Sequence, residues 1–178
     1  MLYAFAFDRI GVVASDLYFV DPTPGPGQEG PEQGVRVELR MVERPPLHGS
    51  IYSAQPIAVE RPIWRVDLLE SVEYPGTLDR AHHHPRFVNG WEPGQRHFVE
   101  ELTADPIGWL SKRLTDLDGV LDDAGVARDE VGPTDVEDVR RAAPEIVDAV
   151  RRLLDGVQRG DLAQPPAENV ERARLSWL

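Results

Sequence analysis

The spacing of the apolar residues changes once along this chain, and that change limits the folds open to it. The segment 35–41 (VRVELRM) alternates strictly, with Val35, Val37 and Leu39 on one face and charged residues on the other. Such alternation is typical of a β-strand with one buried face. From Ala104 the apolar residues instead recur at every third or fourth position, as in amphipathic helices. Strands followed by helices predict an α+β fold, in which a C-terminal helical pair packs against an antiparallel sheet.

Residues 1–100 are expected to be mainly β. The strand candidates are rich in β-branched and aromatic residues, and they are the segments 2–7, 11–20, 35–41, 56–59 and 63–72. The Pro- and Gly-rich segment 21–34 cannot sustain a hydrogen-bonded ladder, so we predict a loop between two strands there. The segment 43–50 (ERPPLHGS) predicts a second break in the sheet.

Residues 104–160 are expected to be mainly α. Asp105 followed by Pro106 is typical of a helix start, because the aspartate accepts hydrogen bonds from the first turn and proline needs no acceptor there. Gly125 is the expected end of this helix. The apolar stripe between these signals consists of Ile107, Leu110, Leu114, Leu117 and Leu121.

A second helix is expected after Thr134, which fits a capping box with Glu137. Pro144 predicts a kink in this helix or a split into two, because proline lacks a backbone donor. The helix is expected to end near Gly156 or Gly160. Its apolar stripe consists of Val136, Val139, Ala143, Ile146, Val150 and Leu153.

The size of the chain favours a single domain over residues 1–178. The segment 170–178 is a possible closing strand of the sheet, with a short final helix as the alternative. The longest uncharged apolar run, IGVVAS, is too short to span a bilayer, and no positively charged segment precedes the apolar N-terminus. We therefore expect a bacterial cytoplasmic protein without a membrane partner.

Charge and composition exclude several classes of function. The net charge of −12 lacks the basic surface that nucleic acids require, so no nucleic-acid partner is expected. The chain contains no cysteine, which excludes disulfides and thiolate metal sites. Residues 101–178 hold 17 acidic and 10 basic residues. That acidic half suggests a basic protein as one alternative kind of partner.

Four of the five histidines lie in the segment 79–97 (DRAHHHPRFVNGWEPGQRH). On an extended strand His82 and His84 point to the same face and His83 to the other. Two imidazoles on one face are suitable ligands for a divalent metal such as Zn or Fe. We predict a metal site formed by His82, His84 and His97. Further candidates for the third ligand are Glu92, Asp79, Asp67 and His48.

A purely structural interpretation of this segment also remains open, with the imidazoles bonded to backbone carbonyls or stacked on aromatic rings. Arg80, Arg86 and Arg96 lie around the histidines. They are candidate substrate-binding residues that would hold a small anionic ligand through a carboxylate or phosphate. They would equally serve to neutralise nearby acids.

The histidine segment partly resembles the first motif of the cupins, since Gly76, His82 and His84 have the spacing G-x5-H-x-H. The glutamate of that motif is missing and no second motif follows, so a cupin fold is not assigned. The segments WRVDLLESV, DRAHHHPRF and GWEPGQRHF resemble a group of uncharacterised bacterial hypothetical proteins carrying D-R-x-H-H-H-P. This resemblance implies no activity.

Three functions are consistent with these patterns. The first is a small metal-dependent enzyme that uses the His82 and His84 pair. The second is a non-enzymatic acidic protein that binds a basic partner. The third is a structural homodimer without bound metal, formed through a sheet edge or through the apolar stripe from Val136 to Leu153.

Overall fold

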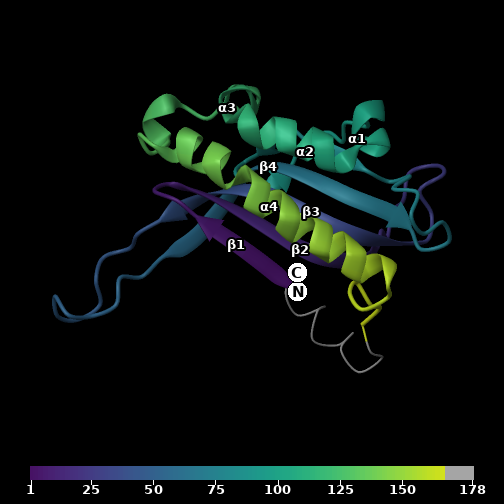
Figure 1. Ribbon diagram of the computed structural model, residues 1–178, viewed down its shortest axis with the longest axis horizontal. Helices are drawn as coiled ribbons and strands as arrows, with labels where there is room; N and C mark the ends of the chain where they lie inside the picture. Colours follow the sequence, from purple (N-terminus) through teal and green to yellow (C-terminus); the bar gives the residue numbers. More distant parts are fainter. Residues whose placement is uncertain (167–178) are drawn as a thin grey trace.

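The computed structural model describes residues 1–166 and has an α+β architecture, in which helices cover one face of an antiparallel sheet (Figure 1). The five strands of the main sheet are neighbours in the order of the sequence. They are β1 (Leu2–Ala6), β2 (Ile10–Val20), β3 (Pro31–Glu43), β4 (Ala58–Ser71) and β5 (His82–His84). A small two-stranded sheet follows, formed by β6 (Phe87–Val88) and β7 (Glu92–Pro93).

The helical half packs on a single side of the main sheet. It comprises α1 (Glu100–Ala104), α2 (Pro106–Thr115), α3 (Leu117–Ala124), the short 3-10 helix η1 (Arg128–Glu130) and α4 (Asp135–Gln158). Figure 1 shows α4 crossing the sheet, where it contacts β2, β3 and α2. No helix within residues 1–166 has the length and apolar character needed to cross a membrane.

The strand register divides the side chains between the two faces. Ala14, Val37, Val66 and His83 form one cross-strand row, and His83 in this row contacts Trp109 of α2. Side chains alternate along a strand, so the neighbouring row through Arg65 and His84 faces away from the helices. The helix-facing side therefore forms the apolar core, and the other side carries charged residues.

The predicted strands are present, with two corrections to their limits. The predicted segments 56–59 and 63–72 form one strand, β4, which continues past Pro62 through an irregular register. Proline donates no ladder hydrogen bond, and a bulge accommodates it. The loop is shorter than the predicted segment 21–34, because residues 31–34 belong to β3 and pair with β2 and β4. Gly34 suits this place, since a Cβ there would lie 2.1 Å from the Leu68 carbonyl oxygen.

The first predicted helix starts and ends as expected but is not continuous. The Asp105 carboxylate accepts a hydrogen bond from the Gly108 backbone at 2.9 Å, and Gly125 ends α3 in a left-handed conformation with φ 72°. The chain breaks at Asp116 into α2 and α3. The apolar stripe runs through this break without a change of period, so the sequence pattern did not reveal it. Helix α1 was not predicted.

Helix α4 corrects two further expectations. It continues through Pro144 instead of splitting there. Thr134 makes no side-chain capping bond, so the predicted capping box with Glu137 is wrong. The stripe of α4 is largely buried in the protein's own core and is not free to form a dimer. The possible closing strand 170–178 lies outside the described residues.

Asp135 joins the two ends of the fold. Its fully buried carboxylate accepts hydrogen bonds from the backbone N–H groups of Asp8 at 2.8 Å, Arg9 at 3.1 Å and Gly132 at 2.8 Å. The first two groups belong to the turn between β1 and β2, and the third precedes α4. The carboxylate therefore fixes the start of α4 to the N-terminal hairpin.

We expect Asp135→Ala to lower the free energy of unfolding by about 3 kcal/mol or more, because it leaves buried backbone donors without an acceptor. Urea unfolding measures this loss. Asp138→Ala is the matched control, since Asp138 lies in the same helical turn and forms only a surface ion pair with Arg141, which contributes at most about 1 kcal/mol. Equal stability losses in the two variants would contradict the role given to Asp135.

Candidate metal centre

The candidate centre is built by the pairing of β4 with β5. Asp67 lies opposite His82, and Arg65 lies opposite His84. All four side chains are on the sheet face away from the helices. The side chains of Asp67, His82 and His84 are 1%, 3% and 2% exposed. Two imidazoles and one carboxylate therefore meet in a buried position.

The ring orientation of both histidines suits metal binding. His82 Nδ1 lies 2.8 Å from the Arg80 carbonyl oxygen, and His84 Nδ1 lies 2.7 Å from that of Gly94. A carbonyl only accepts hydrogen bonds, so each Nδ1 carries the proton and each Nε2 keeps its lone pair. A hydrogen bond from the other ring nitrogen, here Nδ1, to a backbone carbonyl is the usual way in which proteins orient metal-binding histidines.

Both Nε2 atoms face the same carboxylate oxygen. Asp67 Oδ2 lies 3.5 Å from His82 Nε2 and 3.8 Å from His84 Nε2. One ligand atom from each residue lies within 4.8 Å of the others, which is a separation that allows a shared metal ion. The group formed by Asp67, His82 and His84 is called the triad below.

Two arginines already neutralise the carboxylate of the triad. Arg36 donates to Asp67 through Nε at 2.7 Å and through Nη2 at 3.2 Å. Arg65 Nε lies 3.1 Å from Asp67 Oδ2, and Arg65 Nη2 lies 2.9 Å from His84 Nε2. Burial alone would raise the pKa of Asp67, but the charges of Arg36 and Arg65 hold it below its usual value. Arg65 Nη2 therefore occupies the lone pair of His84 Nε2 that a bound ion would use.

Burial disfavours the charged forms of His82 and His84, and metal ligation requires the neutral form. Burial lowers the pKa of His84 to about 4, with a further contribution from the charge of Arg65. Burial also lowers the pKa of His82. On the opposite face, burial and the charge of Arg113 lower the pKa of His83 to about 4.

The structure separates His97 from His82 and His84. His97 pairs through its backbone with His83, and their rings lie 5.4 Å apart. Asp67, one of the five candidates for a third ligand, is the residue that lies beside His82 and His84 in the group that could hold an ion. The remaining three lie elsewhere: Asp79 accepts from the Ser71 backbone, Glu92 is exposed in β7, and His48 is exposed in the loop 44–57.

The three candidate substrate-binding arginines occupy different environments. Arg80 is buried and donates to the Gly27 carbonyl. Arg96 donates to Gln28 at 2.8 Å. Arg86 is exposed and does not contact the triad. Arg80 and Arg96 therefore bind the β2–β3 connection next to the triad, and Arg86 does not.

The partners Arg36 and Arg65 were missed as parts of the site. Arg65 and Asp67 lie on the same face of one strand and form an ion pair that is largely shielded from solvent. The missing information was the pairing of VRVELRM with RVDLLES, which brings Arg36 opposite Asp67. Comparison of the chain with protein-family models, curated proteins and solved structures gives no significant match.

We expect the metal-free protein to lose stability as the pH falls from about 6.5 to 4. Unfolded histidines take up protons near pH 6.5, whereas His83 and His84 in the folded protein do so only near pH 4. Each of these two histidines lowers the free energy of unfolding by up to about 3 kcal/mol over this pH range. Urea unfolding at several pH values, with a chelator present, measures the slope.

His83→Gln should make this slope shallower, because it removes one of the two histidines without touching the triad. His48→Gln removes an exposed histidine and is the matched control. A slope that His83→Gln leaves as steep as in the wild type would show that the buried state of His83 does not govern the acid sensitivity.

Proposed function

We propose that this protein is a small metal-dependent enzyme whose divalent ion is bound by Asp67, His82 and His84. One observation carries this proposal: both buried imidazoles donate Nδ1 to a backbone carbonyl and present Nε2 to one oxygen of Asp67. A structural role for the histidines would explain their burial, but it does not require that two Nε2 atoms lie within 3.5 and 3.8 Å of one carboxylate oxygen.

We propose Zn(II) or Fe(II) as the ion, because this donor set is common for both. Two imidazoles and a carboxylate form the ligand set of many catalytic zinc centres and of the non-haem iron oxygenases. Such a centre keeps at least one coordination position open for water or substrate. The bound ion would supply Lewis acidity or an activated water there.

Arg65 is the residue of this chain that links ion binding to substrate binding. Its Nη2 donates to His84 Nε2 at 2.9 Å in the arrangement described here. If His84 Nε2 were bound to an ion, the Arg65 guanidinium would lose this acceptor and would keep its contact with Asp67. It then offers donors for an anionic substrate beside the metal.

We expect purified protein to carry Zn or Fe at about one ion per chain. Metal at 100 times its dissociation constant adds about 2.7 kcal/mol of stability, which corresponds to a rise in Tm of about 5–10 °C. His82→Gln and His84→Gln should each weaken binding by at least about 100-fold, since losing a ligand costs more than losing a supporting residue.

His83→Gln is the matched control for both ligand variants. It changes an adjacent buried histidine that points to the opposite face, and it should keep both the metal content and the Tm rise. Elemental analysis and thermal unfolding provide the two measurements. Wild-type protein without stoichiometric metal, and with a Tm indifferent to added Zn or Fe, would refute the metal centre.

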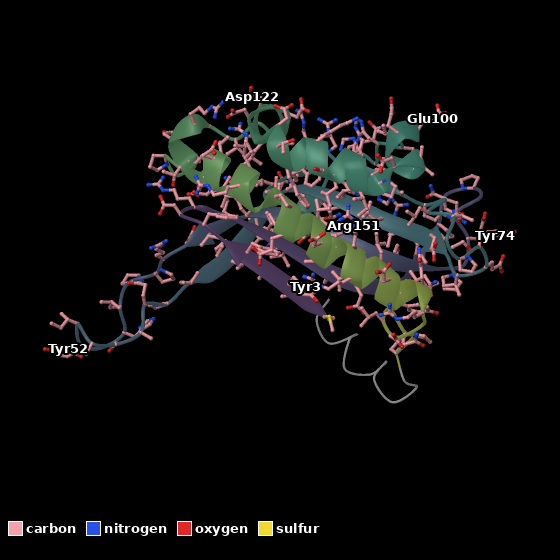
Figure 2. The ribbon with its side chains drawn as sticks, viewed as in Figure 1. Tyr3, Tyr52, Tyr74, Glu100, Asp122 and Arg151 are labelled. Carbon is pink, nitrogen blue, oxygen red and sulfur yellow. The ribbon has the colours of Figure 1, made fainter. Side chains whose placement is uncertain are left out.

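A second candidate function is homodimer formation through the β3–β4 connection, residues 44–57. This loop projects beyond the body of the protein, and Figure 2 shows Tyr52 at its tip. No charged residue occurs in residues 45–59. Ile51 and Tyr52 are 83% and 91% exposed. A second copy suits residues 45–57 of this loop, because burying them removes no charge from water while the acidic bodies stay apart.

We expect the double change Ile51→Ser and Tyr52→Ser to weaken this dimer by at least about tenfold, since it removes two large apolar side chains from the contact. Sedimentation velocity over a wide concentration range measures the association. Val20→Ser removes an exposed apolar residue at the opposite end of the sheet and is the control. A wild-type protein that remains monomeric at every concentration would exclude this function.

A further inference from the structure

A second polar cluster lies on the same sheet face as the triad, and the triad does not account for it. Glu32 lies in β3 opposite Ser71 of β4. Arg80 precedes β5, and its backbone N–H donates to the Leu69 carbonyl at 3.1 Å. Glu32 and Arg80 are 2% and 9% exposed. Two side chains of opposite charge are therefore buried at one end of the sheet.

Both residues have a buried polar atom without a hydrogen-bond partner. These atoms are Oε2 of Glu32 and Nε of Arg80. Asp79 Oδ2 lies 3.2 Å from Arg80 Nε without forming a hydrogen bond. Within residues 1–166 four such atoms occur, and a third, Nε of Arg65, also lies on this face. Unpaired buried atoms are rare in native proteins and indicate a missing partner.

The cover of this cluster is formed by the β2–β3 connection, residues 21–30. At the end of the sheet where Figure 2 labels Tyr74, this connection lies beside the β4–β5 connection, since Arg80 donates to the Gly27 carbonyl. Arg96 binds Gln28 at 2.8 Å and Asp21 at 3.3 Å. Both arginines thus use donors to hold the cover, and neither donates to Glu32.

The charges around Glu32 do not compensate for its burial. Burial raises the pKa of Glu32, and the charges of Arg80 and Arg96 only partly oppose this effect. The carboxylate is therefore poorly stabilised in the ligand-free protein. A ligand that donates a hydrogen bond to Glu32 would stabilise this buried carboxylate.

We propose that Glu32 and Arg80 form a binding subsite for a small carboxylic acid whose adjacent carbon bears an amino or hydroxyl group. The ligand's carboxylate accepts from Arg80 Nε, and its amino or hydroxyl group donates to Glu32 Oε2. Sulfate fits less well, because it would face the Glu32 carboxylate with acceptors alone. A simple amine would leave Arg80 without an acceptor.

This subsite goes beyond the proposed metal centre and does not require it. The unpaired atoms of Glu32 and Arg80 are present without any ion. Arg80 lies two residues before His82, and Glu32 lies four residues along β3 from Arg36, so the subsite is on the same face as the triad but nearer the end of the sheet.

The test compares glycine, glycolate and acetate, which are similar in size and differ in the donor next to the carboxylate. Each is titrated into ¹⁵N-labelled full-length protein with a chelator present, and amide chemical shifts report binding. We expect glycine or glycolate to bind at least about tenfold more tightly than acetate, as for a hydrogen bond to a charged group. The better of the two identifies the amino or the hydroxy class.

Glu32→Gln should abolish the preference over acetate without lowering the Tm of the ligand-free protein, because it removes a poorly stabilised buried charge. Glu38→Gln, on the same strand, is the matched control and should keep the preference. The proposal is overturned if acetate binds as well as the other probes, if none binds, or if Glu32→Gln lowers the Tm and leaves the preference intact. Since metal is excluded, these outcomes are independent of the metal centre.

Discussion

The Asp67 carboxylate is the charge on which the arrangement of three strands depends. Removing a carboxylate from water costs several kcal/mol, and only well-placed partners offset this. The partners come from different strands: Arg36 from β3, Arg65 from β4 itself, and His82 from β5. A slip of one residue in β4 would turn Asp67 toward the apolar face under the helices. The buried charge therefore fixes the register of the sheet as well as the candidate centre.

The two faces of the sheet are covered in different ways. The helix-facing side is filled by apolar residues and closed by α2, α3 and α4. The opposite side is closed toward β5 by short connections rather than by helices, and the residues 21–30 are bound there by Arg80 and Arg96. Connections of this kind separate from a sheet more easily than packed helices. A buried polar site beneath them can thus be reached without opening the core.

The sequence predicted the α+β class because the apolar period changes from two to nearly four, and local signals such as Asp105 and Gly125 marked helix ends correctly. It also placed His82 and His84 on one face, since strand alternation is a local property. His97 was predicted as the third member of the group in place of Asp67, because Asp67 meets His82 only through the β4–β5 register. The pairing of Arg36 with Asp67, 31 residues apart, is equally a tertiary property.

Asp135 has a consequence for the order in which the protein folds. Its bond to the Asp8 backbone joins groups that are 127 residues apart. Closing a loop of that size costs more chain entropy than forming the neighbouring hairpins, so hairpin contacts form first. During synthesis, the backbone N–H groups of the β1–β2 turn cannot bond to the Asp135 carboxylate until most of the chain has left the ribosome. The β1–β2 turn is therefore among the last parts of the fold to be fixed in place, and the nascent hairpin depends on its own strand pairing until then.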